Sequence, residues 1–231
     1  MLKSKNIMFL SLLSISASLV SCGNNNAPAP FSPEYVENYL ETCYGTDFTY
    51  TGEFSSDDAA LEAYTFKDSS GIETVVRKGS REVAIGAKYS VTDCYECSKF
   101  LADEEVRKKL DDSGFEYTFK DWYGIESGIY MSVRSYDDIT KATDVLYDIA
   151  DKCIFTENDK AADFNSGDYK FSGMAMHIEL TDAEGDTLYY INVPSVKKGE
   201  FPYIKSKPEL VTEAQDKYNN NAEMRKSLGR K

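Results

Sequence analysis

The chain has 231 residues, of which 39 are acidic and 26 basic, and its net charge is −13. Such an acidic chain is repelled by nucleic acid, so we expect no nucleic-acid partner. Its hydrophobic content of 42%, with 17 Tyr and 12 Phe, supports a folded core of one medium domain or two small ones and excludes a disordered chain.

The N-terminal residues have the pattern of a signal peptide. Lys3 and Lys5 make a basic start, and residues 7–20 carry no charge. This apolar run has the length of a signal-peptide core and is shorter than the roughly 20 residues that a membrane-spanning helix needs. We therefore expect residues 1–21 to be a signal and not a transmembrane anchor.

The end of that run, Leu19-Val20-Ser21-Cys22, resembles the lipobox of bacterial lipoprotein precursors. The resemblance implies cleavage before Cys22 by signal peptidase II and a diacylglycerol thioether on its sulfur, with fatty acids such as palmitate. Two acyl chains hold a protein stably on a bilayer. The expected location is the extracytoplasmic face of the cell membrane, with the lipid anchor as the membrane contact. The resemblance covers only the first 22 residues.

Residues 22–32 form the lipidated cysteine and a linker rich in Asn, Ala and Pro. The first predicted helix begins after the capping residue Ser32, has Pro33 in its first turn and ends before Gly45. Its apolar residues share one stripe, which we expect to be buried. They are Val36, Tyr39, Leu40 and Cys43.

Apolar residues then recur with a period of two, which predicts an antiparallel meander with one solvent-exposed face. Its strands lie near 48–50, 64–66, 72–76 and 83–91, and residues 68–71 form a turn. A helix follows over 93–112, with a break near Ala102.

Two further strands are expected at 115–119 and 130–133. The most strongly periodic segment, 139–153, predicts a core helix whose buried face ends at Cys153. A loop over 156–169 leads to a hairpin, 174–180 with 188–193, closed by the turn 182–186.

This order predicts an α+β fold in which helices pack on one face of antiparallel sheets. Two similar joins, from Gly45 into Phe48 and from Gly114 into Phe115, indicate a duplicated helix-plus-sheet unit. The α+β domain then spans 33–195, as units 33–91 and 92–195. The first unit resembles a helix-then-sheet pattern of uncharacterised secreted proteins of Gram-positive bacteria, which implies no activity.

Residues 196–231 form a polar tail with nine basic and five acidic side chains. We expect a helix over 209–228 in this tail. Its charge is typical of a solvated helix, while contact with an acidic surface or with the body of the protein itself is the alternative.

With Cys22 used for the lipid, an even set of four cysteines remains: Cys43, Cys94, Cys97 and Cys153. Outside the cytoplasm an even set favours disulfides, and four cysteines allow three pairings between which the sequence does not choose.

The Cys94-Tyr95-Glu96-Cys97 motif, placed between a strand and a helix, resembles the thioredoxin arrangement. Acidic neighbours, Asp93 and Glu96, raise thiol pKa values and so oppose that chemistry. The preceding strand also alternates, whereas a buried parallel strand is continuously apolar. We therefore favour structural disulfides and keep a redox pair as the alternative.

Other catalytic or metal chemistry has little support in the sequence. A zinc site with Cys94 and Cys97 as two of its ligands would need Cys43 and Cys153, both on buried stripes, as the others, and His177 is the single imidazole. That histidine is more typical of a hairpin residue than of a general base. The segment 163–168 resembles the start of a calcium loop, but its glycine comes one position early and no bidentate Glu follows. We expect no metal and no cofactor.

Trp122, Tyr123 and Tyr130 lie around two glycines, where a loop could present flat rings to a glycan or a protein. Burial in the core of a small sheet is the alternative. The sequence thus favours a membrane-anchored extracytoplasmic lipoprotein with a non-enzymatic binding domain for a protein or glycan. The alternative is an extracytoplasmic thiol-disulfide oxidoreductase that uses Cys94 and Cys97.

Overall fold

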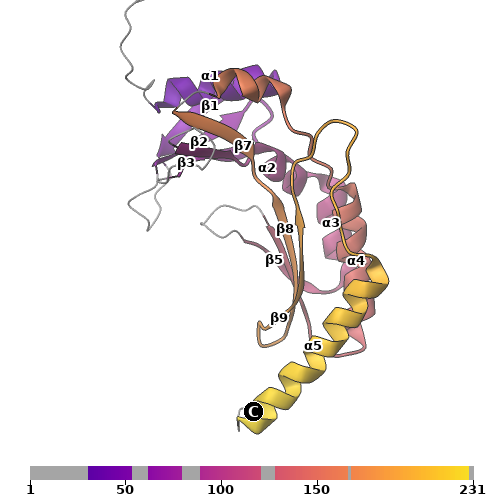
Figure 1. Ribbon diagram of the computed structural model, residues 1–231. Coiled ribbons are helices and arrows are strands. Elements are labelled where there is room, and N and C mark those ends of the chain that lie inside the picture. Colours follow the sequence, from indigo (N-terminus) through magenta and orange to yellow (C-terminus); the bar gives the residue numbers. More distant parts are fainter. Residues whose placement is uncertain (1–30, 54–61, 80–88, 121–127, 166–167, 229–231) are drawn as a thin grey trace, which may run out of the picture.

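The computed structural model describes residues 31–53, 62–79, 89–120, 128–165 and 168–228. These residues form an α+β protein with two open sheets, called sheet A and sheet B. Helices lie on one side of each sheet (Figure 1). The predicted fold class is confirmed, with the difference that each sheet also contains one parallel pair of strands.

Sheet A has the order β1-β2-β3-β4-β7, in which all neighbours are antiparallel except β4 and β7. The predicted meander and its turn at 68–71 are confirmed, since the N–H of Gly71 donates to the carbonyl of Asp68 at 3.0 Å. The strand expected from residue 83 is described only from Tyr89. The five strands are β1 (Phe48–Glu53), β2 (Glu62–Asp68), β3 (Glu73–Lys78), β4 (Tyr89–Asp93) and β7 (Tyr169–Gly173).

Helix α1 (Pro33–Tyr44) covers one face of sheet A. The Ser32 hydroxyl accepts from the N–H of Tyr35 at 3.3 Å, and Gly45 ends the helix with a φ of 68°, a conformation that glycine adopts without strain. The predicted buried stripe is confirmed: Val36, Tyr39, Leu40 and Cys43 are all buried.

Sheet B has the order β5-β6-β8-β9, with β6 and β8 parallel and the other neighbours antiparallel. Helices lie on one side of it (Figure 1). The strands are β5 (Glu116–Lys120), β6 (Gly128–Val133), β8 (Met176–Asp182) and β9 (Thr187–Val193), and the helices are α3 (Glu104–Ser113), α4 (Asp138–Lys152) and α5 (Lys207–Ser227).

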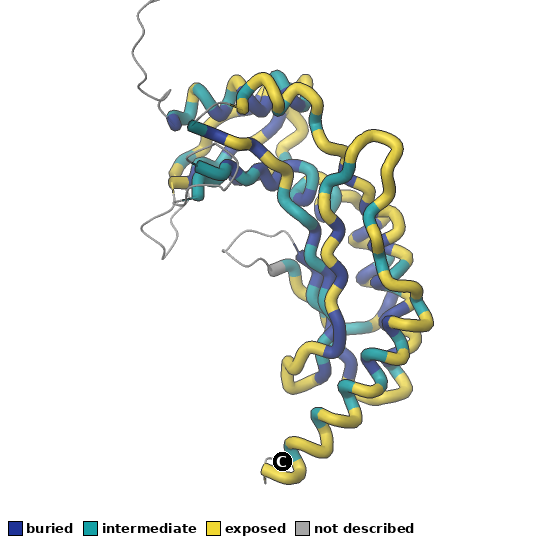
Figure 2. The backbone as a smooth tube through the Cα atoms, viewed as in Figure 1, coloured by how far each residue is buried: buried dark blue, intermediate teal, exposed yellow. Residues whose placement is uncertain are grey.

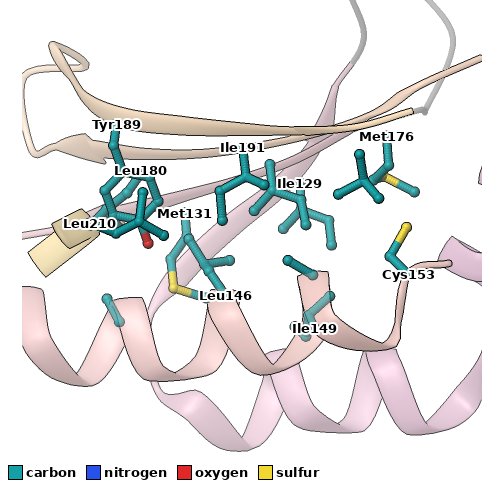
Figure 3. Close-up of a cluster of buried hydrophobic side chains, with 14 of the residues drawn as sticks. Ile129, Met131, Leu146, Ile149, Cys153, Met176, Leu180, Tyr189, Ile191 and Leu210 are labelled. Carbon is teal, nitrogen blue, oxygen red and sulfur yellow. The ribbon is translucent and has the colours of Figure 1, made fainter. Parts of the chain in front are cut away.

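The larger core lies between sheet B and α4. Side chains from α4 point at alternate residues of the strands, as the period of two along a strand requires (Figure 3). The predicted stripe of this helix is confirmed, and Cys153 ends it in a fully buried position. Buried members of the stripe are Ile139, Ala142, Leu146, Ile149 and Ala150.

The two sheets are connected by chain segments that pass between them three times. From β4 the chain enters α2 (Tyr95–Ala102) and α3, and the predicted break is confirmed because Asp103 caps α3 through the N–H groups of Glu105 and Val106. The chain returns to sheet A at β7 and then continues into β8 of sheet B. The stretches 33–91 and 92–195 therefore interleave, because β7 belongs to the sheet of the first stretch.

The tail is a docked part of the fold. Helix α5 begins with a capping box between Ser206 and Glu209, and Leu210 and Ala214 are buried in the core of sheet B. Near its end Arg225 contacts the buried carboxylate of Asp182 at 2.8 Å. The tail therefore contacts the body of the protein, the alternative that its basic charge allowed, and is not the freely solvated helix that was favoured. No helix among the residues described combines the length and apolarity needed to cross a bilayer.

Candidate functional site

A cavity of about 470 Å³ lies at the junction of the two sheets. Its walls come from the end of α1, the first turn of α2, the segment 156–165, the β7–β8 corner and the residues after β9. Ligand pockets commonly measure about 300–1,000 Å³ and often lie between substructures. Its size and position make this junction cavity the candidate site.

Asp93, the last residue of β4, lies behind two tyrosines of the cavity wall. Its Oδ2 accepts from the hydroxyl of Tyr39 at 2.8 Å and from that of Tyr44 at 2.5 Å. Its Oδ1 accepts from the N–H of Tyr95 at 2.8 Å. Asp93 is only 1% exposed, so this carboxylate joins α1, β4 and α2 inside the protein.

Burial controls the acid–base properties of these groups. It raises the pKa of Asp93, although the three hydrogen bonds oppose the rise. Burial also raises the pKa of the half-buried Glu96 at the cavity wall, and Asp93 adds to that increase, whereas Lys99 opposes it. The pKa values of Tyr39 and Tyr44 are raised by burial and then by Asp93, so both hydroxyls stay neutral donors.

A second carboxylate extends the network away from the cavity. The hydroxyl of Tyr95 donates to Oδ2 of Asp68 at 2.7 Å, and the N–H groups of Ser70 and Ile72 donate to its Oδ1. Burial acts to raise the pKa of Asp68, but these hydrogen bonds lower it overall. The turn between β2 and β3 is thereby tied to the start of α2.

Two asparagines hold the opposite wall, which contains the 3₁₀ helix η1 (Asp159–Phe164). The amide of Asn158 donates to the carbonyl of Cys43 at 2.7 Å, and Oδ1 of Asn165 accepts from the N–H of Phe171 at 2.7 Å. The wall is therefore attached both to α1 and to β7. A cavity whose walls are fixed in this way binds a ligand with little loss of conformational entropy.

Acidic groups outnumber basic ones among the described residues that line the cavity. Glu96, Glu157 and Asp159 contribute carboxylates, and Lys170 contributes an ammonium group. The rings of Tyr44 and Phe171 supply apolar surface. The lining therefore favours a polar ligand that carries a positive charge.

The Cys94–Cys97 pair lies where the sequence places it, between β4 and α2, but both thiols are buried. Cys94 is 1% exposed and Cys97 is 0% exposed. The two sulfur atoms of Cys94 and Met174 are 3.3 Å apart, and the thiol of Cys97 donates to the carbonyl of Met174 at 3.4 Å. Neither residue lines the cavity.

No pair of the four cysteines in the described chain lies at disulfide distance. Burial and then Asp93 raise the pKa of Cys43 to about 12, and burial also raises the pKa of Cys97 and Cys153. Because the thiolate is the reactive form, these three thiols are not activated. The disulfides expected among Cys43, Cys94, Cys97 and Cys153 stay a prediction for the oxidised protein.

The predicted aromatic group is described only in part, because Trp122 and Tyr123 lie outside the described residues. Tyr130 alternates with buried residues of β6 and so lies on the face of sheet B opposite the helices. Its ring centroid is 5.5 Å from that of His177, which stacks on Tyr190 at 5.6 Å. Tyr130 therefore belongs to a separate surface and not to the junction cavity.

His177 lies in β8, in the predicted hairpin. Its Nδ1 is 2.8 Å from Oδ1 of Asn192 and its Nε2 is 3.1 Å from Oε2 of Glu179. The resemblance of 163–168 to a calcium loop falls partly outside the described residues. In the part of the chain that the structure describes, no three His, Cys, Asp or Glu side chains gather as a metal site.

Sequence reasoning missed the junction cavity. Tyr39 was expected only as a core residue, and Asp93 and Glu96 only as acidic neighbours of the thiols. One available signal was Asp93 itself, a carboxylate at the end of an alternating strand, which needs a hydrogen-bond donor if it is buried. Its partner Tyr39 lies 54 residues away, and no local pattern connects the two.

Comparison with known proteins gives no functional assignment. No family model, no curated protein and no solved structure matches this chain.

Proposed function

We propose that this chain is a membrane-anchored extracytoplasmic lipoprotein whose non-enzymatic domain binds a small polar ligand in the junction cavity. The observation that carries the binding function is the cavity itself, about 470 Å³ in volume and walled by segments from both sheets. The proposal of an anchor comes from the sequence pattern at Leu19-Val20-Ser21-Cys22.

The chemistry of the lining defines the ligand class. Carboxylates of Glu96, Glu157 and Asp159 attract a cation, and the aromatic ring of Tyr44 lines the same cavity. Ser172 and Ser195 add hydroxyl groups that can hydrogen-bond to polar atoms. We therefore propose a ligand with an ammonium group or another small cation and several polar atoms.

The fold begins close to the proposed lipid. Phe31 is 7% exposed, and its ring stacks on Tyr64 with a centroid distance of 5.2 Å. The domain thus starts nine residues after Cys22, and a fully extended chain of that length spans about 30 Å. A ligand bound by this domain is held near the membrane surface.

An extracytoplasmic thiol-disulfide oxidoreductase is the second candidate, and one observation favours it. Cys94 caps the N-terminus of α2 directly after β4, the local order that such enzymes use. The buried thiols and the raised pKa of Cys97 oppose this activity, because a catalytic thiolate has to reach its substrate. Binding is therefore the better-supported function.

The cavity is tested by filling it. Ser172→Trp adds a large ring at the wall, and Thr49→Trp adds the same ring at an exposed site on the edge strand β1. Melting temperatures are measured with lysine amide as a small cation, N-acetylglucosamine as a neutral sugar and citrate as an anion.

We expect lysine amide to raise the melting temperature of the wild type and of Thr49→Trp but not of Ser172→Trp, because ligand binding stabilises the folded state. Citrate should have no effect. Equal shifts in the two tryptophan variants, or no shift with any probe, would contradict binding in the cavity.

The anchor is tested separately by Cys22→Ala. The wild type should fractionate with membranes and partition into detergent, whereas the variant should lose both properties. A variant that stays with the membrane and is processed at the same peptide bond would overturn the lipoprotein assignment.

A further inference from the structure

We infer that the segment joining β9 to α5 is a second membrane contact, in which Phe201 and Tyr203 enter the lipid headgroup region beside a group of lysines. This segment, residues 194–206, is named the strap. The inference rests on the proposed lipid anchor at Cys22 and adds a surface that neither the anchor nor the junction cavity requires.

The strap exposes the two most accessible aromatic rings of the described chain. Phe201 is 78% exposed and Tyr203 is 83% exposed. The strap is also exposed along much of its length where it arches between β9 and α5 (Figure 2). Single exposed apolar residues are common, but two large neighbouring rings with this accessibility mark an interaction surface.

The strap is attached to the rest of the protein at both of its ends. The N–H of Val196 donates to the carbonyl of Phe155 at 2.9 Å, and the carbonyl of Val196 accepts from the N–H of Glu157 at 2.7 Å. At the other end, the capping box of α5 begins at Ser206. The rings therefore have a defined position on the surface.

The side chains of the strap alternate. Pro202 and Ile204 are partly covered, and Ile204 packs against the core of sheet B. Phe201 and Tyr203 alternate with these two residues and are exposed. In an extended segment residues two apart share a side. Two aromatic rings are thus presented together.

The charge of the strap complements an anionic membrane. It contains Lys197, Lys198 and Lys205 against one acidic residue, Glu200, in a chain of net charge −13. Within the described structure Lys205 pairs with Glu213 at 2.7 Å, whereas Lys197 and Lys198 are exposed at the turn and form no ion pair there. Lysines at a membrane surface attract anionic lipids, and aromatic residues favour the interface between headgroups and acyl chains.

The tether permits this contact. The nine-residue step from Cys22 to Phe31 spans at most about 30 Å when extended, which keeps a domain anchored at Cys22 beside the bilayer. An anchored domain meets its own membrane at a high effective concentration, so even a weak contact through the strap is occupied. The lipid surface is therefore the partner to which we assign the strap.

The test uses the lipidated mature chain, purified from membranes and reconstituted in vesicles. In a background in which the single tryptophan is removed by Trp122→Phe, the probe is Phe201→Trp. The matched control is Leu228→Trp, which is 62% exposed after the end of α5 and lies close to Arg225 and Lys226. Vesicles of phosphatidylcholine with brominated acyl chains are prepared with and without about one third phosphatidylglycerol.

We expect the bromine atoms to quench Phe201→Trp and to shift its emission to shorter wavelength, and both effects should be larger with phosphatidylglycerol. Leu228→Trp should show neither effect. Quenching of Phe201→Trp that is no greater than that of the control would overturn the inference, as would equal quenching without anionic lipid. The mass of the same sample separates the two proposals, because a chain without lipid on Cys22 contradicts the anchor, whereas a lipidated chain with an unquenched probe contradicts only the strap contact.

Discussion

The hydroxyl of Tyr39 offers a sharp test of how the junction is held together, because it can be removed while its ring is kept. Tyr39→Phe deletes the donor that lies 2.8 Å from Asp93 Oδ2. The ring stack on Phe171, with a centroid distance of 4.2 Å, is retained. A hydrogen bond to a charged group contributes about 1.5–3 kcal/mol, so we expect the free energy of unfolding to fall by about that amount at a pH at which Asp93 is ionised.

Tyr35→Phe is the matched control on the same helix. Its hydroxyl donates to the neutral carbonyl of Phe164 at 3.3 Å, a longer bond, so we expect a loss below about 1 kcal/mol. Urea unfolding followed by circular dichroism measures both variants, with an unchanged slope as the check that only stability has altered. Equal losses in Tyr39→Phe and Tyr35→Phe would refute the role assigned to Asp93.

The pH dependence has a definite sign. Burial raises the pKa of Asp93 above its ordinary value of 3.8, so the stability that this group contributes is present below that pH and is lost as the pH rises through the folded-state pKa. The bond from Tyr39 lowers that pKa, and its removal raises it further. The deficit of Tyr39→Phe should therefore grow as the pH rises through the folded-state pKa of Asp93. A deficit that is constant or larger at low pH would contradict this assignment.

Three further experiments test other parts of the fold. Arg225→Gln should lower the melting temperature, because it leaves the buried carboxylate of Asp182 without its cation, whereas the control Lys226→Gln should not. Equal effects of the two changes would show that the contact between Arg225 and Asp182 does not hold α5 in place. Leu146→Ala should lower the free energy of unfolding, measured with urea, by about 2–5 kcal/mol, since Leu146 is 0% exposed at the centre of the core. A loss below about 1 kcal/mol would contradict that packing. Maleimide labelling of the folded, reduced chain should leave Cys97 unmodified and reach the 8%-exposed Cys43 first, and rapid labelling of Cys97 would revive the redox candidate.

The elements that the sequence predicted well are those whose pattern is local. The stripes of α1 and α4, the cap at Ser32 and the break before Asp103 follow from helical spacing and capping residues. The first meander and the last hairpin follow from a period of two. These patterns depend on residues only a few positions apart, so a single sequence contains them.

The features that were missed, which include the docking of α5 but not the helix itself, depend on distant partners. Strand β7 is five residues long and follows a polar loop, and it forms only because β4 offers a parallel edge 80 residues earlier. Helix α5 docks through two buried residues, Leu210 and Ala214, which is too few for a visible stripe. The junction cavity needs both sheets in place, so no single segment predicts it.

The proposed lipid on Cys22 is the feature on which the proposed location and the strap contact both depend, and the intact mass of the protein extracted from the membrane fraction tests it most directly. We predict a chain that begins at Cys22 and carries the added mass of a diacylglyceryl group, with the N-terminal peptide of the digest holding the modification. A chain that begins at another residue, or a Cys22 peptide with an unmodified thiol, would contradict the central claim.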